Sequence, residues 1–244
     1  MSFQLRLVKV DLDIIRVISW NANCKFRDKY HLLSDFDIAV VQECEDPARC
    51  DDNGYQCWAS NHYWIGDLKH KGLGVFLSEN LSANLMELPE TSQKFFLPLQ
   101  LSNGTQLMAV WAMGAANRQD GYVAQIHDYL RSHSHYFDWD KLIIVGDFNS
   151  NAQWDAKRHL RNHGNLVTKL KGYGSQSLYH YKSGELHGAE TSSTFFMYRH
   201  ADKPYHIDYV FVPESRLSSS QIELGETNDW LQYSDHIPLF ADLA

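Results

Sequence analysis

Short apolar runs rich in β-branched residues recur along the whole chain, and no other feature of the sequence constrains its fold as strongly. Turn-forming residues such as Gly, Asn, Asp and Ser flank most of these runs, a pattern typical of β-strands. The sequence therefore predicts strands at residues 14–20, 37–43, 73–78, 95–101, 106–113, 141–147, 206–213 and 237–243.

Fewer segments have a helical pattern. Apolar residues between Val123 and Leu130 recur at the spacing of one helix face, which predicts a helix over residues 122–133. We expect two further helices at residues 28–36 and 154–163. Many strands with few helices between them, and no strict βαβ alternation, favour an α/β fold. In this fold two sheets pack face to face and the helices lie outside, as a layered sandwich.

The composition is that of an ordinary globular protein, with 244 residues of which 44% are hydrophobic and 21% charged. No repeat or linker divides residues 1–244, so we expect one domain. No apolar run reaches the ~18 residues of a membrane-spanning helix. The charges at Arg6, Lys9, Asp11 and Asp13 interrupt the apolar stretch that a signal peptide requires. The sequence therefore predicts a cytoplasmic location without membrane binding.

The formal net charge of −8 means that the average surface repels a polyanion, which argues against passive coating of nucleic acid. It does not exclude an enzyme that reaches a phosphate through a divalent cation, because the ion supplies the positive charge locally. Cys24, Cys44, Cys50 and Cys57 lack the paired spacing of a zinc site, and we expect free thiols. Only Cys50 and Cys57 merit a test for a disulfide.

Polar side chains gather where the predicted strands begin or end. A carboxylate beside a buried strand is costly unless it is paired or bound to a metal. Taken singly, each residue has a simpler explanation: Asn21 could cap a helix, Asp147 could lie in a turn, and His236 could be a hydrogen-bonded core histidine. The complete set is Asn21, Asn23, Gln42, Glu43, Asp147, Asn149, Asp208, Asp235 and His236.

Together these residues belong to five motifs, which are SWNAN, VVQE, GDFNSN, HIDYVF and SDHIPL. In order and approximate spacing the set resembles the endonuclease/exonuclease/phosphatase family, whose fold deoxyribonuclease I, exonuclease III and the abasic-site endonucleases share. The resemblance extends from Trp20 almost to the last residue. It implies a four-layered sandwich of two mixed sheets flanked by helices, and hydrolysis of a phosphoester with Mg²⁺ or Mn²⁺.

The resemblance also implies roles for the motif residues at the metal. Glu43 is the first expected ligand, and Asn21 is either a carbonyl ligand or a residue that orients Glu43. Asp235 is expected beside the metal, directly or through water. Hard oxygen ligands of this kind suit Mg²⁺, which usually takes only one or two carboxylates from a protein.

The resemblance also implies catalytic roles for Asp147, Asn149, Asp208 and His236. Asp147 would orient and deprotonate the attacking water, and Asn149 would hold that water or a phosphate oxygen. Asp208 would fix the tautomer or the charge of His236, which would donate to the phosphate in the transition state. The alternative for Asp208 and His236 is a buried pair that only joins two strands.

One departure from the family concerns the strand before its long helix, which commonly carries a His or Tyr near the scissile phosphate. Here Trp111 and Met113 lie in that region, and neither side chain can transfer a proton. Metal-bound water could take over this role, or the leaving group could be easy to expel.

The substrate is less constrained than the family. The loops at residues 169–188 and 198–208 interleave aromatic and basic side chains, which suits base stacking and phosphate contacts. The expected substrate-binding residues are Asn23, Tyr173, Arg199 and Lys203. A nuclease acting on DNA or RNA is the first hypothesis, and no obligate protein partner is evident. The alternatives are a phosphatase or phosphodiesterase for a small or lipid-derived phosphoester, and a non-catalytic binding module.

Overall fold

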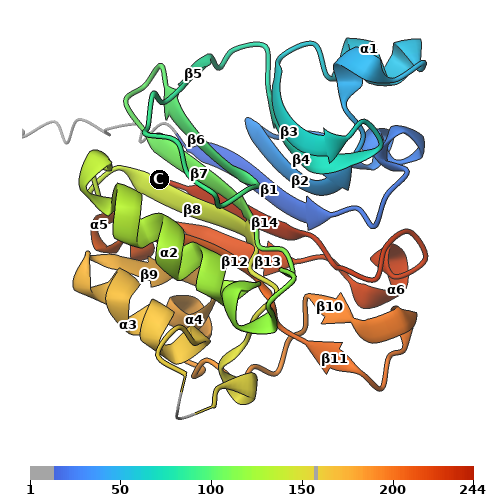
Figure 1. The fold of residues 1–244 in the computed structure, drawn as a ribbon. Helices are drawn as coiled ribbons and strands as arrows, with labels where there is room; N and C mark the ends of the chain where they lie inside the picture. Colours follow the sequence, from blue (N-terminus) through green and yellow to red (C-terminus); the bar gives the residue numbers. More distant parts are fainter. Residues whose placement is uncertain (1–13, 157–158) are drawn as a thin grey trace, which may run out of the picture.

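The computed structural model describes residues 14–156 and 159–244, and two six-stranded sheets form its centre (Figure 1). The first sheet has the order β13-β14-β1-β2-β4-β3, and the second has the order β5-β6-β7-β8-β12-β9. The first sheet comprises β1 (Ile15–Asn21), β2 (Ile38–Cys44), β3 (His62–Leu68), β4 (Lys71–Leu77), β13 (Gln221–Leu224) and β14 (Leu239–Leu243). The second comprises β5 (Ala83–Leu85), β6 (Phe96–Leu101), β7 (Gln106–Trp111), β8 (Leu142–Asp147), β9 (Ser175–Ser177) and β12 (Asp208–Pro213).

A small hairpin and several helices complete the described chain. The hairpin consists of β10 (Phe195–Phe196) and β11 (Pro204–Tyr205). The helices are α1 (Asn53–Trp58), α2 (Val123–His133), α3 (His163–Gly172), α4 (Leu178–Ser183), α5 (Glu214–Leu217) and α6 (Thr227–Trp230). Helices α2 and α3 lie side by side on the outer face of the second sheet (Figure 1).

The main core lies between the two sheets, where aliphatic side chains such as Val40, Val75, Leu107 and Val145 are fully buried. A second cluster of buried hydrophobic side chains packs α2 and α3 against the outer face of the second sheet. An aromatic cluster that includes Phe26 covers the outer face of the first sheet. This arrangement is the four-layered sandwich of two mixed sheets that the motifs imply.

All the strands expected from the sequence are present close to their expected bounds, and so is the helix expected at residues 122–133. The strands that sequence analysis missed are short or lie at sheet edges. One of them, β3, is an edge strand whose side chains are half-buried or exposed, so its apolar pattern is weak. Such strands depend on pairing with a neighbour rather than on their own sequence.

The helix expected at residues 28–36 is absent. Only two 3₁₀ turns occupy this region, η1 (Phe26–Asp28) and η2 (Tyr30–Leu32). Lys29 between them has φ of −130°, and Asp35 has φ of 57°. Neither conformation continues an α-helix, so the apolar residues here pack as turns.

The helix expected at residues 154–163 was also misplaced. Residues 157–158 lie outside the described chain, and α3 begins at His163, where the expected helix ends. The Asn162 side chain accepts a hydrogen bond from the Asn165 amide and caps α3. The Asp155 carboxylate accepts the amides of His163 and Gly164, so the segment before α3 supplies its cap instead of helical residues.

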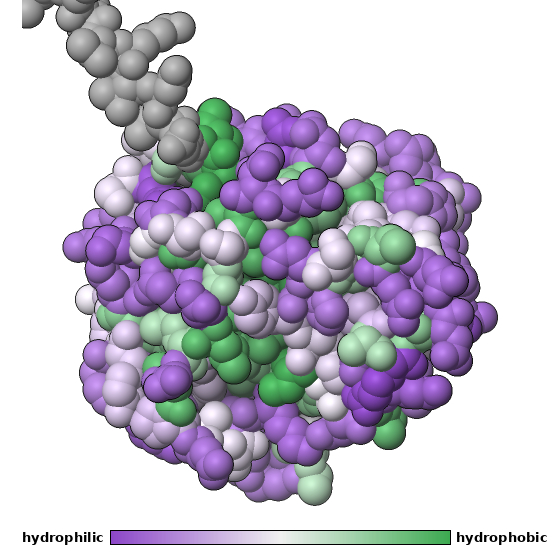
Figure 2. All heavy atoms as spheres, turned by 90° about the horizontal axis from the view of Figure 1, so that it is seen from above, coloured by the Kyte–Doolittle hydropathy of each residue, from purple (hydrophilic) through white to green (hydrophobic). Residues whose placement is uncertain are grey.

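Within the described residues, no helix is both long and apolar enough to span a lipid bilayer. The molecule viewed from above presents a mainly hydrophilic face on which hydrophobic residues form small separate patches (Figure 2). All the cysteines are free thiols, and Cys44 and Cys50 are buried.

The two sheets bring the motif residues to one end of the sandwich. In the first sheet β1 and β2 run parallel, so Asn21 and Glu43, which lie at the C-terminal ends of these strands, are at the same edge of the sheet. In the second sheet Asp208 at the start of β12 lies directly opposite Asp147 at the end of β8. The Asn21 side chain donates to Asp147 and thereby links the two sheets.

Candidate active site

Asp147 lies at the centre of the motif residues and is completely buried. Asn21 Nδ2 donates to Asp147 Oδ2 over 3.0 Å. Asn149 donates twice, from its backbone amide to Oδ1 over 2.8 Å and from its side chain to Oδ2 over 2.9 Å. The Asn149 side chain also donates to the Ala112 carbonyl, which ties the site to the end of β7. These donors orient the carboxylate and compensate for much of its burial.

Gly146, immediately before Asp147, is required by the backbone. Its φ is 142°, and a Cβ atom here would lie 1.9 Å from the Val110 carbonyl oxygen of the neighbouring strand. Asn149 also has a positive φ, of 47°, which Asn tolerates better than most residues. The GDFN segment therefore folds as a turn held against β7, as its Gly and Asn residues suggest.

Asp208 and His236 form a buried pair, with Asp208 Oδ2 2.9 Å from His236 Nδ1. The Thr194 hydroxyl accepts the Asp208 amide and so fixes the start of β12. The Ser234 hydroxyl accepts the His236 amide and donates to the Asn21 carbonyl. The loop that carries His236 is therefore hydrogen-bonded to the end of β1 through Ser234.

The charges of these three groups are coupled. Ligand atoms of Asp147, Asp208 and His236 lie within 4.8 Å of one another. Burial and the charge of Asp208 raise the pKa of Asp147 from 3.8 to about 7, against the opposing effects of His236 and Asn21. Burial lowers the pKa of His236, but the charge and hydrogen bond of Asp208, together with the charges of Asp147 and Asp235, outweigh burial and raise that pKa to about 9. Near neutral pH the site thus holds an imidazolium beside a carboxyl group able to exchange a proton.

Glu43 projects from an irregular point in β2. The register between β2 and β4 shifts between Gln42 and Cys44, and Glu43 has φ of 60°. Its carboxylate pairs with the Lys71 ammonium over 3.1 Å and accepts from Cys24 Sγ over 3.4 Å. A bulge of this kind redirects one side chain out of the alternation of the strand.

Asn23 and Asp235 lie beside the buried network rather than inside it. The Asn23 amide donates to Asn21 Oδ1, and Asn23 itself is half-buried. The Asp235 carbonyl accepts the Phe196 amide, so the hairpin of β10 and β11 is attached next to His236. The negative charge of Asp235 also helps to raise the pKa of His236.

The structure does not bring the other expected substrate-binding residues into this network. Tyr173 caps the end of α3, stacks on Trp139 and donates to Ser134, which follows α2. Because β8 begins near that end of α2, Tyr173 lies at the opposite end of the sheet from Asp147.

Arg199 and Lys203 lie in the connection between β10 and β11. The Arg199 guanidinium donates to the carbonyls of Gln232 and Tyr233, a contact that attaches the hairpin to the C-terminal region. The Lys203 ammonium lies 5.8 Å from the centre of the exposed Tyr198 ring. Both residues are exposed and adjoin the His236 side of the site.

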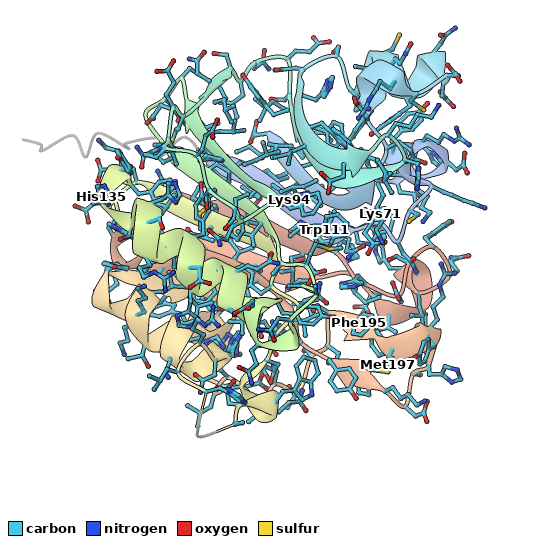
Figure 3. The ribbon with its side chains drawn as sticks, in the orientation of Figure 1. Lys71, Lys94, Trp111, His135, Phe195 and Met197 are labelled. Carbon is cyan, nitrogen blue, oxygen red and sulfur yellow. The ribbon has the colours of Figure 1, made fainter. Side chains whose placement is uncertain are left out.

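Trp111 ends β7 and, with Met113, stands in the region where the sequence led us to expect a family His or Tyr. It pairs in register with Asp147 and is buried. Its Nε1 has no hydrogen-bond partner among the described residues. The Lys71 ammonium lies 5.4 Å from its ring centre, and Figure 3 shows the two side chains near each other.

The side chains fit a hard divalent cation. Asp208 Oδ1 is buried without a hydrogen-bond partner among the described residues, so it has a free acceptor position. Asp147 and Asp208 supply carboxylate oxygens within 4.8 Å of each other and of a His236 ring nitrogen, and Glu43 separately pairs with the Lys71 ammonium group. Oxygen-rich sets of this kind favour Mg²⁺ or Mn²⁺ over softer metals.

The geometry agrees with the family match. The model of the endonuclease/exonuclease/phosphatase family matches residues 18–236. The chain belongs to this family. Its members hydrolyse phosphoesters, and the chain is accordingly a phosphoester hydrolase. A search of curated protein sequences found no match.

Solved structures share the fold at low sequence identity. The 3′-5′ exonuclease NExo from Neisseria meningitidis is 19% identical with a TM-score of 0.66, and the alignment covers 94% of this chain and 99% of that one. An AP endonuclease from Archaeoglobus fulgidus is 15% identical with a TM-score of 0.65, covering 93% and 98%. Truncated TDP2 from Caenorhabditis elegans is 14% identical with a TM-score of 0.60, covering 95% and 97%.

Sequence analysis missed four residues that support the site, namely Lys71, Thr194, Ser234 and Asn151. Ser234 and Asn151 stand inside the SDH and GDFNSN motifs, so their positions offered a signal. Lys71 and Thr194 stand in segments without any motif, and only the folded chain brings them to Glu43 and Asp208.

Proposed function

We propose that this protein is a divalent-metal-dependent phosphodiesterase that hydrolyses phosphoester bonds of DNA. The observation that carries the proposal is the linked network of Asn21, Asp147, Asn149, Asp208 and His236, in which every side chain is oriented by another. A fold that needed only stability would gain little from two buried carboxylates and an imidazole in contact. Solved structures with this fold include NExo described as a 3′ phosphatase bound to a product DNA hairpin, which supports DNA as the substrate.

The side chains can perform an in-line attack of water on a phosphate. Asp147, held by two asparagines, accepts a proton from the attacking water, because its raised pKa makes it a usable base near neutral pH. Asn149 orients that water or a phosphate oxygen. His236, kept protonated by Asp208, donates to a nonbridging oxygen as negative charge develops there.

Glu43, Asp208 and Asn21 would hold the divalent cation, with Asp235 beside it. When bound, the ion would supply Lewis-acid stabilisation of the phosphate and of the leaving oxygen, and the positive charge that a protein with a net charge of −8 needs in order to approach a polyanion.

A small phosphoester is the second candidate substrate. Two observations favour it over a polynucleotide: the acidic net charge, and the buried Trp111 in the place of a family proton donor. Without a donor for a poor leaving group, an activated or small ester is easier to cleave.

The test is a Mg²⁺-dependent hydrolysis panel of single- and double-stranded DNA, 3′-phosphorylated DNA, RNA, a nucleotide p-nitrophenyl ester and an inositol phosphate. Asp147→Ala is expected to abolish turnover while the protein stays folded. Asp140→Ala is the matched control, because Asp140 is exposed and lies before β8, at the opposite end of that strand from Asp147. Turnover of only the small esters would replace DNA with the second candidate, and no turnover of any substrate would refute the proposal.

A further inference from the structure

Among the residues that the structure describes, Lys71 is the only Lys or Arg whose side chain forms an ion pair with an expected site residue, Glu43. It begins β4, which pairs with β2 next to the bulge that carries Glu43. The Lys71 ammonium lies 3.1 Å from Glu43 Oε2. It also lies 5.4 Å from the ring centre of Trp111, whose strand neighbour is Asp147. One cation therefore contacts both a metal-ligand candidate and the residue beside the catalytic carboxylate.

The contact with Glu43 competes with metal binding by the same carboxylate, because Lys71 and Cys24 both lie against its Oε2 atom. A divalent cation at Glu43 would repel the ammonium group and replace it as the neutralising charge. The Lys71 side chain is 34% exposed, and its four-carbon stem is flexible, so the ammonium group is free to take another position.

The residues around Lys71 favour an anion as the group that its ammonium contacts after it leaves Glu43. Lys71 and Trp111 line a cavity of about 380 Å³ together with Lys94, Phe95, Met113 and Gln125. Lys71, Lys94 and Trp111 are labelled in Figure 3 and lie in the same region. Lys94 pairs with Asp67 in a largely exposed contact, whereas the buried Trp111 Nε1–H lacks a partner among the described residues. An ammonium group that lines a cavity is suited to pairing with an oxygen of a phosphate group.

We propose that Lys71 is a substrate-binding residue whose ammonium group pairs with Glu43 in the metal-free protein and moves to an oxygen of the scissile phosphate when a divalent cation binds. This inference rests on the proposed function. It accounts for the absence of a His or Tyr in the region of Trp111 and Met113, because the positive charge of Lys71 stabilises the developing negative charge from the same side. No proton leaves Lys71 in this role.

The experiment compares wild type, Lys71→Met and Lys71→Arg by Mn²⁺ titration calorimetry and by hydrolysis of the substrate found in the panel. Lys71→Met should bind Mn²⁺ several-fold more tightly, because the competing cation at Glu43 is gone. Its kcat/KM at saturating metal should fall about 10²-fold, the size of effect seen when a donor to a transition-state oxyanion is lost. Lys71→Arg, which keeps the charge, should recover most of that loss.

Lys69→Met is the matched control, because it removes the same charge from an exposed residue of the same β3–β4 hairpin. It should change neither metal affinity nor turnover. Unchanged Mn²⁺ affinity in Lys71→Met would overturn the exchange at Glu43, and unchanged kcat/KM would overturn the phosphate contact. Absence of any hydrolysis by wild type would refute the proposed function instead, and the calorimetry would still test the exchange.

Discussion

Replacing His236 with asparagine should change the pH dependence of stability by an amount that the structure sets. His236 is 5% exposed, and its pKa rises from 6.5 to about 9 on folding, against the effect of burial, because it is paired with Asp208. Each pKa unit corresponds to about 1.4 kcal/mol, so the imidazolium contributes about 3 kcal/mol to the free energy of unfolding. Since the folded pKa is the higher one, this contribution is complete below about pH 6.5 and is lost as the pH rises through about 9.

Urea unfolding in the presence of EDTA measures the contribution of the His236 imidazolium to the free energy of unfolding of the metal-free protein. The comparison should be made in an Asp147→Asn background, because the charge of His236 also acts on the pKa of Asp147. The destabilisation caused by His236→Asn should be larger at about pH 6 than at about pH 9.5, by less than the full value of about 3 kcal/mol, because this background lacks the charge of Asp147 that helps to raise the pKa of His236. The same destabilisation at both pH values would mean that the imidazole is neutral in the folded protein. The roles given to Asp208 and His236 would then be wrong.

Three further substitutions test other parts of the site. Gly146→Ala should destabilise the protein by at least about 3 kcal/mol in thermal or urea unfolding, because its Cβ would overlap the Val110 carbonyl and its φ is positive. Asp147→Asn should abolish turnover, and its effect on the melting temperature should be more favourable at about pH 8 than at about pH 5, since the Asp147 carboxyl has a raised pKa and destabilises the folded protein when it ionises. Tyr173→Phe should leave kcat/KM unchanged, because the ring still stacks on Trp139. A large loss of activity in this variant would restore Tyr173 as a substrate contact.

The fold and the centre of the site were predictable because their signals are local. Apolar runs that end in polar motifs identify buried strands and the edge at which they stop. Once those strands are paired, Asn21, Asp147 and His236 are expected to lie close together. In the structure Asn21 donates a hydrogen bond to Asp147, and the charge of His236 acts on the pKa of Asp147. The helices expected at residues 28–36 and 154–163 failed because capping and left-handed residues, rather than periodicity, decide those segments.

Lys71 shows why the remainder of the site was not predictable. It stands in a hairpin with no motif, and its chemistry depends on a bulge in the neighbouring strand that turns Glu43 toward it. Sequence periodicity assigns a strand residue to one face or the other, so a register shift of one residue is invisible to it. Contacts of this kind arise from pairing between distant segments.

Backbone strain connects these observations. Glu43 and Asn149 both have positive φ values, of 60° and 47°; Glu43 lies at the bulge near the end of β2, and Asn149 lies two residues after β8. A Glu in this conformation costs on the order of 1–3 kcal/mol, which the surrounding structure must offset. For Asn149 the bonds to Asp147 and Ala112 do so, whereas Glu43 has only Lys71 and Cys24. The small number of contacts to Glu43 agrees with the proposed replacement of the Lys71 ammonium group by a metal ion, because a carboxylate fixed by several donors would have no free oxygen for the metal.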